Sequence, residues 1–393
     1  MHLQLALHHV GRHGEPSLAL DHHRRGGVIA TGLDSQHPHG HLSPAPDRRI
    51  VKGPVPPADL TTGTGERKPV IHQTVRIGTR GSPLALWQAR WVQSRLEQHH
   101  PGLEVTLVPI KTQGDKILDV PLARVGGKGL FVKELEDALL DGRADLAVHS
   151  MKDMPTGLPT GLTLGPILER HDPRDAFLSL HHAALDRLPE GARVGSSSLR
   201  RQSQVLARRP DLEVISLRGN IGTRIARLEA GDFDAILLAA AGVQRMALTA
   251  HVKEYLEPER MLPAIGQGAV GIELRQEDPR VAALVAPLDH PPTRLRVLAE
   301  RAFLTTLEGG CQVPIAGHAV LDGDRLILEG LVAGLAGRPL LRACHSGPLG
   351  EPEALGRQLA RQLLDRGADR ILAELYAAAP PSASPPAVDR TAG

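Results

Sequence analysis

Short apolar runs alternate with longer stretches of helical apolar spacing from about residue 75 onward. Residues 75–80 and 103–110 have the pattern of strands. Between them, Ser82 and Pro83 open a stretch with the pattern of a helix, with Ser at the N-cap and Pro at the first helical position. The alternation continues to residue 242. Strands that alternate with helices predict a mainly parallel sheet of the α/β class.

The alternation breaks at two places. Residues 155–180 contain short strands and turns, which predict a crossover of the chain between two similar lobes. After Pro291 the pattern changes to one helix, three short strands and a final helix. This second change predicts a small α+β domain.

Both ends of the chain lack any such pattern. Residues 1–71 are rich in His, Gly and Pro, and the tail over residues 379–393 is rich in Pro, Ala and Ser. Segments of this kind bury too little apolar surface to offset chain entropy, so we expect both to be disordered. His37, His39 and His41 could chelate a metal, but a solvated tail is the better interpretation. We therefore predict no metal site.

Composition excludes several classes of protein. Lys and Arg (46) nearly balance Asp and Glu (44), so no general basic field indicates nucleic acid. Two cysteines cannot form a disulfide framework and fit a reducing cytosol. There is no run of 18 apolar residues, and the first residues lack the pattern of a signal peptide. We expect a cytoplasmic protein with no membrane span.

Cations and hydroxyl groups follow five of the predicted strands. In open parallel sheets, ligands bind beyond the carboxyl ends of strands, so we expect these loops to converge on one edge. Arginine binds carboxylate or phosphate with two parallel hydrogen bonds, which indicates a ligand with several negative charges. The residues are Arg80 and Ser82; His149, Ser150, Lys152 and Asp153; Ser196, Ser197, Ser198, Arg200 and Arg201; Arg218 and Arg224; and Gly242 with Arg245.

Asp153 is the one carboxylate in this set, and two interpretations are open. It can be a counter-ion that keeps the empty pocket neutral. It can also be a catalytic acid, or a group that stabilises positive charge developing on the substrate. The two roles are compatible.

Two glycine-rich segments match nucleotide motifs only in part. Lys128 in the stretch 124–133 is followed by Gly129, so the phosphate-loop motif is absent. The stretch can be a mobile lid that carries Arg124 and Lys128 to a cleft, or a merely solvated loop. The glycines of 266–271 run into the pattern of a strand rather than a helix, so we predict a hinge between lobes instead of a dinucleotide site.

Cys311 follows Glu308 and two glycines at the end of a predicted helix. Most lone cysteines are buried small apolar residues, yet this loop position also suits a reactive or modified thiol. Cys344 has the pattern of an ordinary strand residue.

Taken together, these segments resemble the porphobilinogen deaminase family, whose members are also called hydroxymethylbilane synthases. The resemblance runs from about Arg76 to the final helix, in the family's order. The segments that carry it are RIGTRGSPLALWQA, KTQGDKILDVPLARVGGKGLFVKELEDALL, ADLAVHSMKDMP, ERHDPRDAF, VGSSSLRRQSQ, DLEVISLRGNIGTRIARL, AILLAAAGVQR, LPAIGQGAVGIE and LEGGCQVPIAG.

The resemblance implies two lobes like those of periplasmic binding proteins, joined by a crossover hinge, and a small third domain with the cysteine. It implies domains over residues 72–168 with 269–286, 174–262 and 291–378. It also implies a dipyrromethane cofactor joined to Cys311 by a thioether. On this primer four porphobilinogen molecules are condensed head to tail with loss of ammonia, and water releases the linear tetrapyrrole. Members are typically monomers.

The resemblance also implies roles for single residues. Asp153 matches the catalytic acid, which assists loss of the amino group. Arg124 stands where a lysine is common, and we expect it and Phe131 in a lid. Residues 1–71 have no counterpart in the family. The positions that match carboxylate-binding residues are Arg80, Ser82, Lys128, Lys152, Ser198, Arg200, Arg201, Arg218, Arg224 and Arg245.

A non-catalytic anion-binding protein with two lobes is the competing interpretation. It accounts for the arginines and the hinge. It gives no reason for Cys311 on a glycine loop or for Asp153 among cations.

Overall fold

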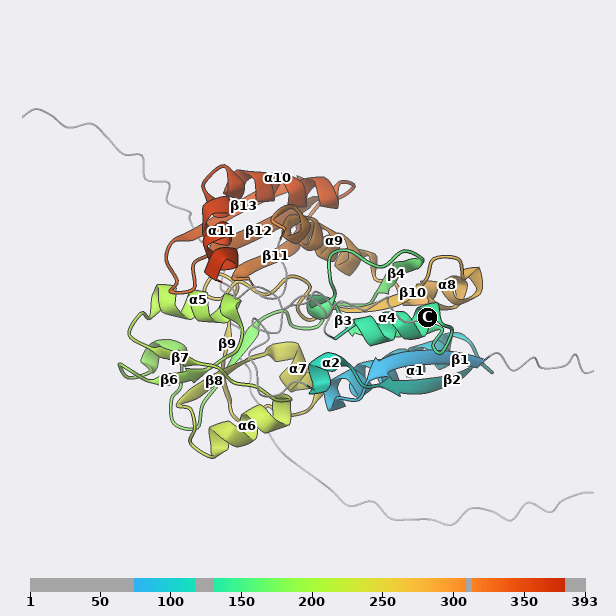
Figure 1. Cartoon of the computed structure of the whole chain (residues 1–393), viewed down its shortest axis with the longest axis horizontal. Coiled ribbons are helices and arrows are strands. Elements are labelled where there is room, and N and C mark those ends of the chain that lie inside the picture. The colour runs from blue at the N-terminus through green and yellow to red at the C-terminus, as the bar shows by residue number, and fades with distance from the viewer. Residues whose placement is uncertain (1–73, 117–130, 309–312, 379–393) are drawn as a thin grey trace, which may run out of the picture. The chain divides into compact units, whose positions relative to one another are not determined.

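The computed structural model in Figure 1 describes residues 74–116, 131–308 and 313–378. The termini that we predict to be disordered, 1–71 and 379–393, lie outside these ranges. The described chain forms three sheets with helices packed on them.

The first sheet has the strand order β2-β1-β3-β10-β4. β1 pairs in parallel with β2 and β3, whereas β10 is antiparallel to both β3 and β4. In Figure 1, β10 has a later colour than the strands beside it, because the chain returns to this sheet after building the second one. The strands are β1 (Thr74–Arg80), β2 (Glu104–Ile110), β3 (Leu146–Ser150), β4 (Leu162–Ile167) and β10 (Val270–Arg275).

The second sheet repeats this plan with the order β7-β6-β8-β5-β9. β6 is parallel to β7 and β8, and the reversed strand is again the fourth in the order, here β5. Both reversed strands follow a crossover from the other sheet, so the two lobes are topologically alike. The strands are β5 (Asp175–Leu178), β6 (Arg193–Gly195), β7 (Glu213–Ile215), β8 (Ala235–Ala239) and β9 (Val252–Leu256).

Helices follow the strands of both lobes. The first lobe holds α1 (Pro83–His99), the short α2 (Gln113–Lys116), α4 (Lys133–Leu140), the 3₁₀ turn η1 (Met151–Asp153), α8 (Pro279–Val285) and η3 (Ala286–Leu288). The second lobe holds η2 (Leu185–Arg187), α5 (Leu199–Arg208), α6 (Ile221–Glu229) and α7 (Ala240–Arg245).

α1 begins where the sequence predicts. The Ser82 hydroxyl accepts a hydrogen bond from the backbone N–H of Ala85, and Pro83 occupies the first turn, where its missing N–H costs nothing. The buried positions Gln88, Ala89, Val92 and Leu96 recur at helical spacing. This stripe packs the helix on the first sheet and leaves Ser82 at the end of β1.

The third sheet is antiparallel and consists of β11 (Ile315–Asp322), β12 (Arg325–Ala333) and β13 (Leu340–Pro348). α9 (Pro291–Thr306) and α10 (Pro352–Leu364) pack together over it around Phe303. The prediction of one final helix is wrong, because the structure adds α11 (Ala368–Ala378). Gly367, with φ of +96°, ends the first helical stretch, since left-handed backbone suits glycine.

The glycines of 266–271 form the entry to β10, and the predicted strand after them is present. Gly266 and Gly268 have φ of +67° and +89°. A Cβ on Gly268 would also lie 2.6 Å from the carbonyl oxygen of His171. The backbone conformation therefore accounts for these glycines, and a nucleotide-binding role is not needed to explain them. The predicted α/β class, with mainly parallel sheets in two lobes and a small α+β unit, is confirmed.

Candidate active site

The predicted strand-end residues come from two sheets. The expectation of a single sheet edge is wrong, because β1 and β3 belong to the first sheet and β6, β7 and β8 to the second. The two sets nevertheless lie close enough to interact. Asp153 in the first lobe interacts electrostatically with Arg224 in the second, and so does Lys152 with Arg201.

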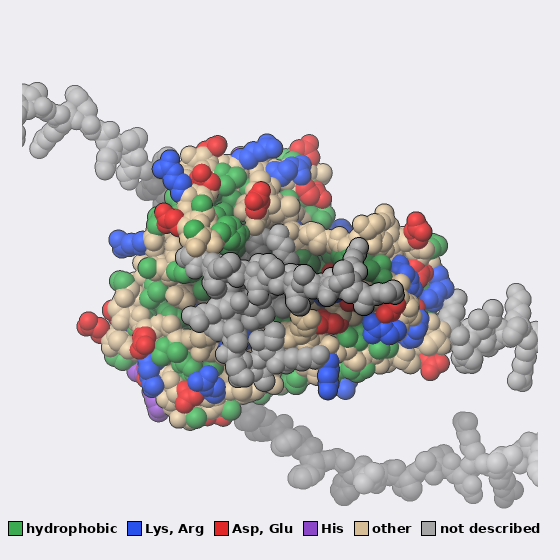
Figure 2. Space-filling model, viewed as in Figure 1, with side chains coloured by type: hydrophobic (Ala, Val, Ile, Leu, Met, Phe, Trp, Pro, Cys, Tyr) green, Lys and Arg blue, Asp and Glu red, His purple; other side chains and the backbone are tan. Residues whose placement is uncertain are grey.

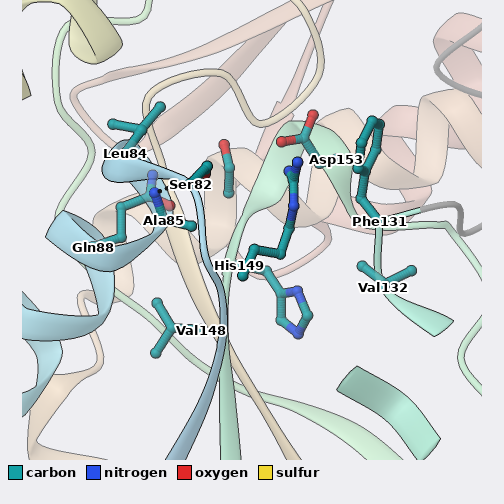
Figure 3. Close-up of a pocket in the computed structure, with 11 residues that line it drawn as sticks. Ser82, Leu84, Ala85, Gln88, Phe131, Val132, Val148, His149 and Asp153 are labelled. Carbon is teal, nitrogen blue, oxygen red and sulfur yellow. Dashed lines mark hydrogen bonds between the residues drawn. The ribbon is translucent and has the colours of Figure 1, made fainter. Parts of the chain in front are cut away.

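One pocket with a cavity volume of about 50 Å³ lies on the first lobe, at the ends of β1 and β3 (Figure 3). In Figure 3, the residues of α1 stand on one side, and Asp153 and Phe131 stand on the other. Among the described residues, Asp153 is the only carboxylate that lines it. The lining residues are Arg80, Ser82, Leu84, Ala85, Gln88, Phe131, Val132, Val148, His149, Ser150 and Asp153.

Phe131 packs between a cation and a glycine. The Arg80 guanidinium carbon lies 4.2 Å from the centroid of its ring, within range of a cation–π contact. On another side the ring approaches Gly114 of α2 so closely that a Cβ there would overlap it. The aromatic ring thus stands beside Arg80 at the pocket.

Asp175, at the start of β5, holds two of the predicted arginines. Nη1 and Nη2 of Arg200 donate to it at 2.7 and 3.2 Å, and Nε and Nη2 of Arg201 donate at 3.1 and 2.8 Å. Asp175 is fully buried. Burial raises its pKa, but the two guanidinium groups outweigh burial and hold it well below the usual range.

Asp175 was not among the predicted site residues. The only signal in the sequence was its place in the segment ERHDPRDAF, which gave it no role. Its position in the fold explains why two adjacent arginines can be buried at the end of a helix. Arg201 also donates to the carbonyl oxygen of Leu237, and Arg200 to that of Leu262.

Three other cations of the set are partly or fully buried: Lys152 and Arg224 are half-buried, and Arg245 is buried. Lys152 lies in a desolvated position, and burial lowers its pKa to about 8 against the opposing effect of Asp153. Burial, with help from Arg201 and Arg218, lowers the pKa of Arg224 to about 10. Burial alone lowers the pKa of Arg245 to about 10. Such a concentration of cations away from water is unfavourable until an anion joins it.

Arg245 reaches from α7 to the first lobe. Its Nη2 donates to the carbonyl oxygen of Gly268 at 2.9 Å, and its guanidinium lies 5.6 Å from the Trp87 ring. Nε of Arg245 and Nε of Arg200 are buried, and the described residues offer them no acceptor. A bound carboxylate could supply the missing acceptors.

The serines after β6 stabilise local structure. Ser198 caps α5 by accepting from the N–H of Arg201 at 3.4 Å. Ser197 donates to the carbonyl oxygen of Leu217. This bond ties the end of β6 to the segment that carries Arg218.

Three predicted site residues, Arg124, Lys128 and Cys311, lie outside the described residues. Cys344 is exposed on β13. No group of three or more His, Cys, Asp or Glu side chains able to hold a metal ion occurs in the described part of the chain. Within the same ranges no helix is long and apolar enough to cross a membrane. On the face in Figure 2, acidic and basic side chains are interspersed.

Two sequence profiles match the chain. The profile of "Porphobilinogen deaminase, dipyromethane cofactor binding domain" matches residues 75–283, and that of "Porphobilinogen deaminase, C-terminal domain" matches residues 294–365. The chain belongs to the porphobilinogen deaminase family. Its activity is that of the transferase hydroxymethylbilane synthase in tetrapyrrole biosynthesis, with porphobilinogen as substrate and dipyrromethane as cofactor.

Several solved structures show a distant similarity. The periplasmic VFT2 domain of BvgS from Bordetella pertussis is 14% identical over 55% of this chain and 86% of its own, with a TM-score of 0.35. The periplasmic aliphatic sulphonate binding protein SsuA from Escherichia coli is 14% identical over 60% of this chain and 71% of its own, also with a TM-score of 0.35. These values are too low to bear on the ligand.

Proposed function

We propose that Asp153 is the catalytic acid of the condensation. The observation that carries this role is its position in a pocket that also contains Arg80 and Ser82, where it is the only carboxylate from the described part of the chain. Each condensation forms a carbon–carbon bond and releases ammonia, so a proton must reach the departing amine. A carboxyl group at Asp153 can deliver it, and the carboxylate left behind stabilises positive charge on the reacting pyrrole. The acceptor pyrrole carbon loses a proton when the new bond forms, and the carboxylate can take up this proton, which regenerates the acid.

The cations around this pocket bind the carboxylates of cofactor and substrate. Porphobilinogen carries an acetate and a propionate, so each addition brings two more negative charges. The half-buried charges of Lys152 and Arg224, the buried charge of Arg245 and the unpaired Nε of Arg200 fit such a polyanion. The full set is Arg80, Ser82, Lys128, Lys152, Ser198, Arg200, Arg201, Arg218, Arg224 and Arg245, and we propose Arg124 and Phe131 as lid residues.

Asp175 holds Arg200 and Arg201 in place for the ligand. Because it neutralises part of the charge of Arg200 and Arg201, it allows both to stay buried before any ligand is bound. It also fixes both guanidinium planes, so little side-chain entropy is lost when a carboxylate arrives.

The dipyrromethane cofactor is joined to Cys311 by a thioether. When bound, it supplies the terminal pyrrole carbon to which the first substrate is added. The cations of both lobes would hold its carboxylates, among them Arg80 in the first lobe and Arg245 in the second. The protein acts as a cytoplasmic monomer, with functional units at 72–168 with 269–286, 174–262 and 291–378.

Intact mass of the purified protein tests the attachment. We expect the wild type to be heavier than its sequence by two pyrrole units. Cys311→Ala should lose this adduct and the activity, whereas the matched control Cys344→Ala should keep both, because Cys344 lies exposed on β13. A folded wild type with no adduct and no activity would refute the attachment and leave an anion-binding role.

A further inference from the structure

A histidine and a glutamate are buried together beneath the pocket. Nε2 of His149, in β3, lies 3.0 Å from Oε2 of Glu273, in β10, and their side chains are 4% and 0% exposed. In the antiparallel register Glu273 pairs with Ala147, two residues before His149, so both side chains project from the same face of the sheet.

Glu273 depends on this contact. Neither of its carboxylate oxygens accepts a hydrogen bond of good geometry from the described residues, so His149 is the charge it faces most closely. A lone carboxylate in the middle of a sheet is strongly destabilising unless a cation or a proton neutralises it. Apolar residues of similar volume often stabilise a protein as well as a buried ion pair does, so stability alone does not account for the pair.

The pair lies at the point where two chain segments of the site meet. β3 ends at Ser150 and passes into the turn η1, which carries Lys152 and Asp153. The N–H of Met151 in this turn donates to the carbonyl oxygen of Ala269, just before β10. Gly271 of β10 faces Met151 so closely that a Cβ there would overlap its sulfur. A shift of β10 is therefore transmitted to the turn.

His149 also lines the same pocket as Asp153 and Arg80. From α4, the buried Glu136 faces the pair, with Lys133 and Asp137 farther along that helix. Burial raises the pKa of Glu136, and the charge of Glu273 raises it further, while His149 opposes both. The charged groups around His149 are thus Glu273 on β10, Glu136 on α4, and Arg80 and Asp153 across the pocket.

We propose that His149 and Glu273 form a buried ion pair that fixes the end of β3 and so positions Lys152 and Asp153 for the reaction. His149 is a positioning residue in this scheme. The inference rests on the role proposed for Asp153. Its effect is on turnover, because a misplaced proton donor slows the chemistry while the cations still hold cofactor and substrate.

A pair of leucine variants tests this in the full-length, cofactor-loaded enzyme. His149→Leu leaves Glu273 buried without a partner, so we expect kcat to fall about tenfold or more with KM nearly unchanged. The double variant His149→Leu/Glu273→Leu removes the uncompensated charge and should regain most of the stability of the wild type, while its kcat stays about tenfold or more below the wild type because the ion pair is gone. Intact mass confirms that each variant carries the cofactor.

Glutamine variants separate charge from packing. If His149→Leu does not fold, His149→Gln replaces it, because glutamine keeps an N–H donor toward Glu273 but carries no charge. Its kcat should still fall, by less than in the leucine variant.

Wild-type kcat in the single variant or in the double variant would overturn the pair's role. A failure of the proposed acid can be told apart from a failure of the pair. If Asp153→Asn retains full turnover while both leucine variants still lower kcat, the proposed acid is wrong and the ion pair stands.

Discussion

Arg170 and Glu300 join the crossover segment between the lobes to helix α9. Nη1 of Arg170 donates to Oε1 of Glu300 at 2.5 Å and Nη2 donates to Oε2 at 3.2 Å, and both side chains are almost fully buried. Glu300 also accepts from the N–H groups of Gly266 and Ala319. One carboxylate thus ties together the crossover, the entry to β10 and the third sheet.

Arg170→Gln should lower the free energy of unfolding by about 3–5 kcal/mol at pH 7, because it leaves Glu300 as an uncompensated buried charge. Burial raises the pKa of Glu300, but Arg170 and His318 together lower it from 4.5 to about 2. The stabilisation is therefore complete above about pH 4.5 and is lost as pH falls toward about 2. Urea unfolding at pH 7 and pH 3 should show the deficit of the variant shrinking in acid.

The exposed pair of Arg143 with Asp141 provides the control. Both side chains are about half exposed, so Arg143→Gln should change stability by less than about 1 kcal/mol at either pH. Equal losses in the free energy of unfolding of the two variants would show that the buried Arg170 pair stabilises the protein no more than an exposed pair does.

Asp153→Asn should keep the fold and the cofactor and lose about 10²-fold or more in kcat, since it removes a proton donor and a negative charge from the pocket. Steady-state kinetics and intact mass measure the two effects. Asp137→Asn, on the exposed surface of α4, should behave like the wild type. Near-normal turnover of Asp153→Asn would mean that Asp153 only balances the charge of the neighbouring cations.

Asp175→Asn should destabilise the protein by about 3–5 kcal/mol, because the Arg200 and Arg201 guanidinium groups would remain buried without an anion. A bound polyanion would restore part of the lost stability, so the destabilisation should be greater in protein purified without cofactor. Arg218→Gln, at a half-buried position, should instead raise KM and change stability by less than about 1 kcal/mol. Chemical denaturation and kinetics of both variants distinguish a charged residue that stabilises the fold from one that binds the ligand.

Gly114→Ala should displace the Phe131 ring from Arg80, because a Cβ at this position overlaps the ring. Loss of a cation–π contact of about 0.5–1 kcal/mol corresponds to about a two- to fivefold rise in KM. Gly157→Ala is the control, since a Cβ there meets nothing. An unchanged KM in Gly114→Ala would separate Phe131 from substrate binding.

A chain that begins at residue 72 should fold and turn over like the full-length protein. The family profiles start at residue 75, and residues 1–71 lack a core-forming pattern. Kinetics and thermal unfolding of the truncated chain test this. A marked loss of either would give the N-terminal segment a role.

Local patterns in the sequence determined the α/β class, the start of α1 at Ser82 and Pro83, and the strand that follows the glycines of 266–271. These features depend on side chains a few residues apart, where capping and apolar spacing act directly. The segments of the family motif likewise identified the activity and the cofactor, because each lies contiguous in the chain.

Contacts between distant segments were decided only by the tertiary structure. The sequence showed five strand ends with cations but not that they belong to two sheets, since strand order depends on the crossovers of β5 and β10. Asp175 and Glu273 are ordinary acidic residues along the chain. They gain their partners, Arg200 and His149, through burial and register, because electrostatic interactions depend on position in space.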